Sequence, residues 1–285
     1  MRLALAALLA LLAGAPARAQ PPVWVVRDAD SEIVLFGSVH VLPEGLNWRP
    51  ATLDRALRDA DDLWFELPID AGAELAAAQL AVKSGMLPKG QRLSDLLAPE
   101  DQARLERMAG RYGLAPAFLD GMQPWFAEVA LAAAAYQAAG ARADHGVEKQ
   151  IAARAPPAAE RRAFESVEEQ LAIFADTPRA AQVASLSASL KEMEADPKAF
   201  EDLVAAWMRG DVGALRQEAL EPLKAAAPVL YRRLVTERNE RWLTALRQRL
   251  AGSGETVVVV GVGHLLGPDG LPERLRALGY SVEGP

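Results

Sequence analysis

The sequence TVVVVGVGHLLGPDGL (residues 256–271) contains a run of four valines, which is typical of a β-strand buried on both faces. Two glycines follow the valines, and the turn that they permit leads to His264. The stretch IVLFGSVHVLP (residues 33–43) has the same order, an apolar strand followed by Gly37 and then His40. The chain therefore carries the pattern strand–G-x-x-H twice.

The two G-x-x-H patterns predict one shared functional site. Glycine after a buried strand permits a tight turn and a close approach of the backbone to a ligand. The histidine then lies at the carboxyl edge of the sheet, where open α/β sheets bind ligands. Two of the three histidines have this placement. The alternative is that each is a loop histidine with satisfied hydrogen bonds and no chemical role.

The segments around these strands indicate an α/β fold. Residues 22–28 and 31–38 are predicted strands around a short turn, and residues 49–60 have the apolar spacing of a helix that starts near Pro50. Residues 61–68 form a further short predicted strand. This strand–helix–strand order favours parallel pairing of the second and third strands.

The two ends of the chain are expected to build a small mixed sheet, from about residues 22–68 and 255–285. Residues 70–250 repeat apolar residues at three- and four-residue intervals and predict a large helical insertion. Residues 143–176 interrupt this pattern. There we expect a helix, a short strand around Ala163–Glu165 and another helix.

The first 19 residues are predicted to be a cleaved signal peptide, with basic Arg2, an apolar run and the small-residue motif Ala17-Arg18-Ala19. An uncleaved N-terminal anchor is the alternative. We expect residues 20–285 to be a single domain that is periplasmic or secreted and has no transmembrane segment.

Composition excludes several classes of partner and site. The formal net charge of −7 becomes −9 once the two arginines of the leader are removed, so nothing attracts the chain to a phosphate backbone and nucleic acid is excluded. The sequence has no cysteine. A disulfide framework, a thiolate metal site and a thiol nucleophile are therefore excluded as well.

Glu66 is the leading candidate beside the two histidines. It lies in the strand-like LWFELP, where a buried carboxylate is costly unless it has a partner. It is either a strand-end residue paired with an arginine or a metal ligand and general base beside His40. Two imidazoles and one carboxylate can hold a divalent metal with an open position, so His40, His264 and Glu66 form the predicted metal set.

Other polar residues are weaker candidates. Glu165 ends a short apolar stretch and is a possible second catalytic carboxylate, and Arg238 is a possible catalytic cation or one partner of a salt bridge. Glu148 opens a helix and is explained equally well by the helix dipole. Ser38 lies in G-S-V-H, which is not the nucleophile elbow of serine hydrolases. His145 is expected at the surface.

The chain resembles the TraB/GumN family over nearly its whole predicted mature length. The matching segments follow the family's order: GSVHVLP, DLWFELP, GVEKQIAAR, FESVEEQLAIF, ERNERW and VVVVGVGHLLGPDGLPERLRALGY. The family usually has G-[VI]-D at residues 146–148 and L-E-T at residues 164–166, so both carboxylates are kept here. The wider group includes the Tiki metalloproteases and, more remotely, erythromycin-esterase-like and haem-binding ChaN-like proteins. The resemblance to Tiki implies metal-dependent proteolysis, with roles for His40, His264 and Glu66.

The preferred interpretation is an exported, metal-dependent hydrolase that acts on a peptide or protein. A metal would polarise a carbonyl and activate water, and Glu66 or Glu165 would accept the proton. Nitrogen and oxygen ligands are compatible with zinc, manganese, cobalt or iron. Two alternatives remain, a binding protein that sequesters a peptide, haem or metal, and a metal-independent hydrolase in which a His–Glu pair activates water.

Overall fold

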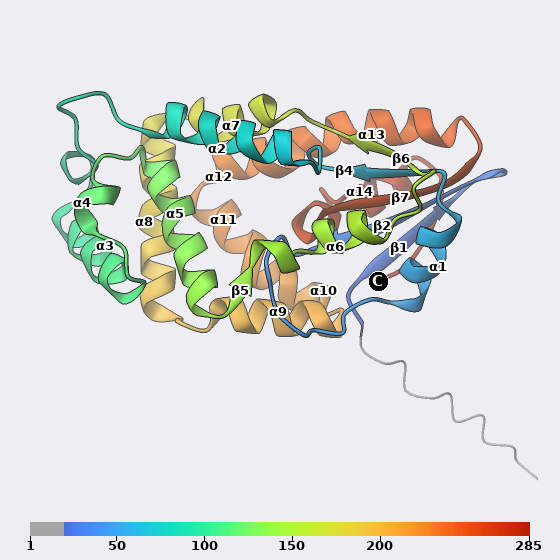
Figure 1. Ribbon diagram of the computed structural model, residues 1–285, viewed down its shortest axis with the longest axis horizontal. Coiled ribbons are helices and arrows are strands. Elements are labelled where there is room, and N and C mark those ends of the chain that lie inside the picture. Colours follow the sequence, from blue (N-terminus) through green and yellow to red (C-terminus); the bar gives the residue numbers. More distant parts are fainter. Residues whose placement is uncertain (1–19) are drawn as a thin grey trace, which may run out of the picture.

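The computed structural model describes residues 20–285, so the predicted signal peptide lies outside the described residues. The fold is built on a six-stranded mixed sheet with the strand order β6-β4-β7-β2-β1-β8 (Figure 1). Its strands are β1 (Val23–Arg27), β2 (Ser31–Ser38), β4 (Asp62–Phe65), β6 (Glu160–Ala163), β7 (Gly254–Gly261) and β8 (Ser281–Glu283). A separate two-stranded sheet pairs β3 (Leu42–Pro43) with β5 (Ala141–Arg142). The α/β class predicted from the sequence is confirmed.

Strand β7 is the centre of the sheet. It pairs in parallel with β2 on one side and with β4 on the other. The valine run 257–260 has no exposed surface, as expected for a strand covered on both faces. The hairpin of β1 and β2 and the terminal strand β8 extend the sheet with antiparallel pairs. The N- and C-terminal segments therefore form the core of the sheet together.

Two details of the strand prediction are corrected by the structure. Strands β2 and β4 are parallel to each other, but β7 lies between them, so they are not neighbours. Local sequence could not reveal this insertion because β7 comes from the far end of the chain. The short strand expected around Ala163–Glu165 begins earlier, at Glu160, and pairs in parallel with β4.

Helices make up most of the remaining chain and extend beyond one end of the sheet (Figure 1). They are α1 (Ala51–Asp59), α2 (Ala71–Gly85), α3 (Pro99–Arg111), α4 (Pro116–Leu119), α5 (Pro124–Ala138), α6 (Val147–Arg154), α7 (Val167–Ala175), α8 (Arg179–Ala195), α9 (Ala199–Arg209), α10 (Val212–Leu215), α11 (Glu221–Ala226), α12 (Pro228–Tyr231), α13 (Glu237–Leu250) and α14 (Leu271–Ala277). Helices α3, α5 and α8 pack around an apolar cluster separate from that of the sheet, including Leu105, Leu131 and Leu186. Within residues 20–285, no helix combines the length and the apolar character that a bilayer span requires.

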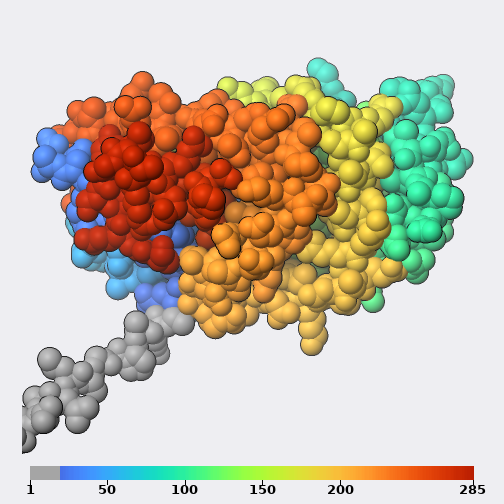
Figure 2. All heavy atoms as spheres, turned by 180° about the vertical axis from the view of Figure 1, so that it is seen from behind, coloured from blue at the N-terminus to red at the C-terminus, as the bar shows by residue number. Residues whose placement is uncertain are grey.

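An aromatic cluster fixes the end of β2 that leads into the first G-x-x-H turn. The rings of Phe36 and Trp48 stack with centroids 5.5 Å apart, and Trp207 of α9 packs against both. The indole nitrogen of Trp207 donates a hydrogen bond of 2.8 Å to the carbonyl of Gly37. The opposite view shows the C-terminal segment, in red, beside helical segments in orange on the surface (Figure 2). The helical region thus braces the strand end from which His40 follows.

Candidate functional site

The candidate site lies where four parallel strands end. Because β2, β7, β4 and β6 all run in the same direction, their carboxyl ends meet at one edge of the sheet. His40 follows β2 by two residues, and His264 lies in the 3₁₀ turn η5 (Val262–Leu265) directly after β7. Glu66 and Glu165 come just after β4 and β6. The two G-x-x-H turns are therefore on the same edge, as the sequence predicted.

His40 is held by a carboxylate from the start of helix α6. Its Nδ1 atom lies 2.7 Å from Glu148 Oε1, and the hydroxyl of Ser38 donates to the same oxygen at 2.5 Å. The imidazole is 62% exposed, whereas the Glu148 side chain is only 12% exposed. Among the described contacts of His40, none involves Nε2. The result is an exposed imidazole that is oriented by a buried carboxylate through one ring nitrogen.

The paired charges shift both pKa values. The negative charge of Glu148 raises the pKa of His40 to about 9, so the imidazole is mainly protonated at neutral pH. Burial raises the pKa of Glu148. The charge of the imidazolium and the hydrogen bonds from His40 and Ser38 lower it by more, so the net pKa shift is downward. The pair is therefore an imidazolium and a carboxylate in the resting protein.

Glu66 accepts hydrogen bonds from three directions. Its Oε2 accepts a hydrogen bond from Arg238 at 2.5 Å and one from the side-chain amide of Gln170 at 3.2 Å. Its Oε1 accepts a hydrogen bond from the backbone N–H of Gly261 at 2.6 Å. Burial by itself raises the pKa of Glu66, yet the positive charge of Arg238 and the hydrogen bond from Gly261 hold the net pKa well below its ordinary value. A carboxylate stabilised in this way is a weak proton acceptor.

Glu165 anchors the opposite side of Arg238. Both of its oxygens accept from Arg238 Nε, at 3.1 and 2.9 Å, and Oε1 also receives the N–H groups of Arg241 and Trp242. The Glu165 side chain is 2% exposed. Its lone pairs face donors of the protein, so Glu165 is a buried partner of Arg238.

His264 is buried in the same network with both ring nitrogens in contact. Arg238 Nη1 lies 2.9 Å from Nε2, and the Asn239 side-chain oxygen lies 2.7 Å from Nδ1. An arginine can only donate, so Nε2 is the acceptor and the ring proton is on Nδ1. Burial, opposed in part by the charge of Glu66, lowers the pKa of His264 to about 3. His264 is therefore a neutral imidazole packed at 4.3 Å between ring centroids against Trp242.

The exposed pair and the buried network meet at Gly261. The position that a Cβ atom would take at Gly261 is 3.1 Å from Glu66 Oε1 and 3.3 Å from His40 Nε2. His40 Nε2 and Glu66 Oε1 thus both border the space that the missing side chain leaves. This arrangement gives a physical reason for glycine in the second G-x-x-H motif, since a side chain there would fill the contact region between the two groups.

The arrangement does not fit a metal held jointly by His40, His264 and Glu66. In residues 20–285, no group of three or more His, Asp or Glu side chains is placed as a metal-binding set. Arg238 contacts both Glu66 Oε2 and His264 Nε2, the atoms that a metal would need, and its guanidinium would also repel a cation. Two of the three predicted ligands, His264 and Glu66, are therefore already engaged by an arginine.

The residues predicted to form the site lie together in the structure. The structure gathers all five predicted site residues, His40, Glu66, Glu165, Arg238 and His264, at one edge of the sheet. The catalytic and metal roles assigned to them stay predictions.

Sequence reasoning undervalued Glu148 and Ser38, and it missed Asn239. Ser38 and Asn239 had only their proximity to candidates as a signal, Ser38 inside G-S-V-H and Asn239 next to Arg238. His145, expected at the surface, is instead half-buried, and its Nδ1 atom is buried. It ends the 3₁₀ turn Ala143–His145 just before helix α6, and the first residue of that helix donates to Val39 in the His40 loop (residues 39–41).

Comparison with known proteins gives the family but not the activity. The chain is 24% identical over 257 residues to the uncharacterized protein YbaP of Escherichia coli (strain K12), a match that covers 90% of this chain and 92% of the relative. YbaP of Shigella flexneri matches with the same identity and coverage. No solved structure gives a significant match. The TraB/PrgY/gumN family matches residues 22–284, nearly the whole described chain. The chain therefore belongs to the TraB/PrgY/gumN family.

Proposed function

We propose that this protein is an exported hydrolase in which His40 and Glu148 form a proton-transfer pair that cleaves an ester or amide bond without a bound metal. The observation that carries the proposal is an exposed imidazole with one nitrogen held by a buried carboxylate and the other without a partner among residues 20–285. A base oriented by a carboxylate is the arrangement that general acid–base catalysis requires.

His40 Nε2 is the atom that accepts a proton and later returns it. As the neutral imidazole, His40 accepts a proton from water while the water oxygen forms a bond to the carbonyl carbon. The imidazolium then returns that proton to the leaving oxygen or nitrogen as its bond to the carbon breaks. Glu148 stabilises the imidazolium between the two steps, and the hydrogen bond from Ser38 keeps Glu148 in position.

Arg238 and its two glutamates hold the floor of the site. Their geometry supports a positioning role, because Arg238 joins the ends of β4 and β6 to helix α13 through Glu66 and Glu165. Glu66 Oε1 also accepts a hydrogen bond from the Gly261 backbone, next to the space that His40 Nε2 borders. This hydrogen-bonded network would hold the end of β7 in place next to His40.

Hydrolysis is tested with a panel of chromogenic esters and fluorogenic peptides. We expect His40→Ala to lower the rate by about a hundredfold or more, the usual contribution of a general acid–base group. Arg58→Ala, a substitution on the exposed face of helix α1, is the control and should leave the rate unchanged. Full rates in both His40→Ala and Glu148→Gln would show that the pair has no catalytic role.

The metal question is tested in the same assay. We expect turnover to survive a wash with EDTA and 1,10-phenanthroline, and we expect the purified protein to hold less than one divalent ion per chain. Loss of turnover after the wash, with recovery on adding zinc or manganese, would instead establish a metal-dependent hydrolase. In that case His40→Ala, His264→Ala and Glu66→Ala should each reduce metal content. Tight binding of a peptide, haem or metal without turnover would establish the sequestering role.

Export is tested by N-terminal sequencing of the protein recovered from the cell envelope. We expect an N-terminus at or near Gln20, because the predicted cleavage motif ends at Ala19. Recovery of a chain that still begins at Met1 would support the uncleaved anchor.

A further inference from the structure

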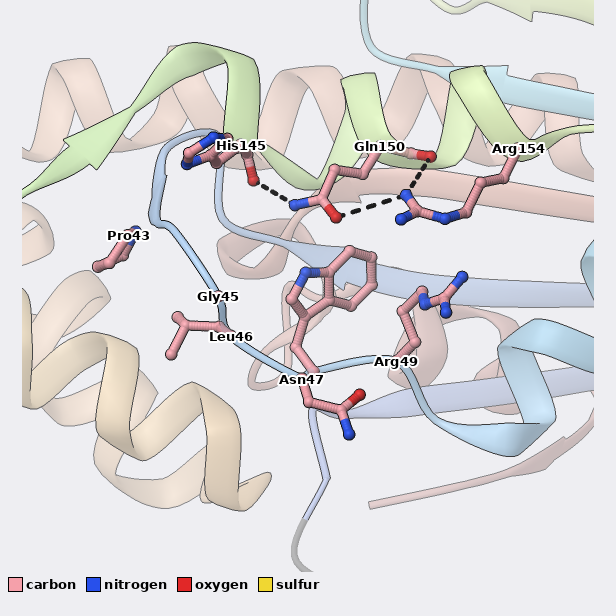
Figure 3. Close-up of a pocket in the computed structure, with 9 residues that line it drawn as sticks. Pro43, Gly45, Leu46, Asn47, Arg49, His145, Gln150 and Arg154 are labelled. Carbon is pink, nitrogen blue, oxygen red and sulfur yellow. Dashed lines mark hydrogen bonds between the residues drawn. The ribbon is translucent and has the colours of Figure 1, made fainter.

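A pocket with a volume of about 280 Å³ lies beside the His40 loop (Figure 3). One wall is the segment 43–49, which follows His40 in the chain, and the other is the segment 145–154, which contains Glu148. The two walls face each other in the close-up, with Arg49 on one and Arg154 on the other. The pocket thus lies between the segment that follows His40 and the segment that contains Glu148.

The lining of the pocket is cationic although the chain as a whole is acidic. Arg49 and Arg154 are among its nine lining residues, and no aspartate or glutamate is. The formal net charge of the whole chain is −7. Two guanidinium groups without a lining carboxylate give a local positive potential that attracts anions.

Neither guanidinium is fully engaged by the protein. Arg154 Nη1 donates to the backbone and side-chain oxygens of Gln150, at 3.0 and 3.4 Å, and no salt bridge of Arg154 occurs among residues 20–285. Arg49 has a single carboxylate contact, with Asp54 at 3.6 Å, which is longer than a hydrogen bond. An arginine carries five N–H donors in a fixed fork, so both residues keep donors for a ligand.

His145 is part of the pocket wall next to helix α6. Its Nδ1 atom is buried and has no hydrogen-bond partner within the described part of the chain. Its carbonyl accepts a hydrogen bond of 2.7 Å from the Gln150 side chain, so the start of helix α6 is held in place around it.

We propose that this pocket binds an oxyanion, the carboxylate or phosphate group of a small ligand, between Arg49 and Arg154. Planar guanidinium forks match the oxygen geometry of both groups. The volume accommodates an acid group together with a short attached chain, and Leu46 and Pro43 offer apolar contact for that chain.

Binding in the pocket is coupled to His40 through the backbone. Val147 N–H donates to the carbonyl of Val39 at 3.3 Å, and a side chain at Gly146 would collide with the carbonyl oxygen of His40. A ligand that joins the two walls therefore stabilises the contact between the His40 loop and the first turn of α6. This inference does not depend on whether the pair hydrolyses a substrate.

The test is calorimetric titration of the purified chain with inorganic phosphate and, separately, with succinate. We expect saturable binding of at least one probe, and we expect Arg49→Ala and Arg154→Ala each to weaken it about tenfold or more, the effect of losing a charge-assisted hydrogen bond. Arg58→Ala removes an exposed arginine that does not line the pocket and is the matched control. Thermal melts of all three variants check that folding is retained.

Each outcome of the titration decides the proposal. Binding of phosphate alone assigns a phosphate ligand, binding of succinate alone assigns a carboxylate, and binding of both assigns recognition by charge. Absence of saturation for both probes up to about 10 mM, the weakest range in which a built site is useful, overturns the proposal. Binding that persists unchanged in both Arg49→Ala and Arg154→Ala overturns it as well. The coupling is read separately from the chemical shift of His40, which should move on saturation in the wild type but not in Arg154→Ala.

Discussion

Glu148 Oε1 lies 2.7 Å from His40 Nδ1, and this contact sets the charge of an imidazole that is otherwise open to solvent. The negative charge of Glu148 raises the pKa of His40 to about 9. We expect an NMR titration to place the His40 pKa well above its ordinary value of 6.5, and Glu148→Gln to bring the pKa down toward that value. A wild-type pKa near 6.5 would mean that the pair does not form in solution.

The same shift predicts the pH dependence of hydrolysis. The step that removes a proton from water needs neutral His40, so the rate should rise with pH and level off near 9. In Glu148→Gln the rise should move to lower pH, because the imidazolium loses its stabilising charge. A pH–rate profile measured on both proteins checks this. A profile that falls between pH 7 and 9 would assign His40 the role of an acid in the limiting step.

Arg238 should be essential for stability in a way that neighbouring arginines are not. Its removal leaves Glu66 and Glu165 buried without their main partner, and loss of one partner of a buried ion pair costs about 3–5 kcal/mol. We expect Arg238→Ala to lower the free energy of unfolding by about that amount in urea titrations. Arg241→Ala is a matched control, since Arg241 also contacts Glu165 but is half-exposed, and its cost should stay below about 1 kcal/mol.

His264 should make the protein sensitive to acid. Burial lowers its pKa in the folded state to about 3, whereas the unfolded chain takes up the proton near 6.5. Between these pH values the unfolded state binds more protons than the folded state. The contribution of His264 to the free energy of unfolding is therefore fully present above pH 6.5 and is lost as the pH falls toward 3. The loss amounts to about 4 kcal/mol at the acid end. Melting temperatures between pH 7 and pH 4 measure it.

A variant separates this effect from general acid unfolding. His264→Asn cannot take up a proton, so it should be less stable than the wild type at pH 7 but lose less stability on acidification. Parallel pH curves for the two proteins would show that His264 is not the responsible group.

Gly261→Ala should fold but lose most of its activity. Its backbone has φ −49° and ψ 132°, a conformation that alanine adopts without strain. The added methyl group, however, would lie 3.1 Å from Glu66 Oε1 and 3.3 Å from His40 Nε2. We expect Gly261→Ala to fold, to shift the NMR signals of His40 and to lose most turnover. Gly110→Ala, where a Cβ meets nothing within 4 Å in helix α3, should leave activity unchanged.

Local patterns in the sequence predicted the sheet well because they are set by neighbouring residues. The valine run, the two glycine turns and the helix that starts near Pro50 are all visible in short windows, and each is present in the structure. The insertion of β7 between β2 and β4 depends on a pairing across most of the chain, and no short window contains it.

The site was predictable in position but not in its internal partners. Two glycine–histidine turns at the ends of parallel strands had to lie close together once β2 and β7 paired. The sequence could not show that Arg238 donates hydrogen bonds to both His264 and Glu66, because one arginine among many on a helix carries no distinguishing pattern. Glu148 was undervalued for a similar reason. A carboxylate in the first turn of a helix is explained by the helix dipole until its distance to His40 is known.

The central place of β7 determines when the molecule can fold. Synthesis runs from the N-terminus, so the hairpin of β1 and β2 and the strand β4 exist long before the residues that must join them. Until residues 254–261 emerge, the inner edges of β2 and β4 have no partner strand and the carboxylate of Glu66 has no Gly261 amide. For a chain that crosses a membrane before folding, this order is an advantage. Under the proposed export, the sheet would close only once residues 254–261 have crossed and can pair with β2 and β4.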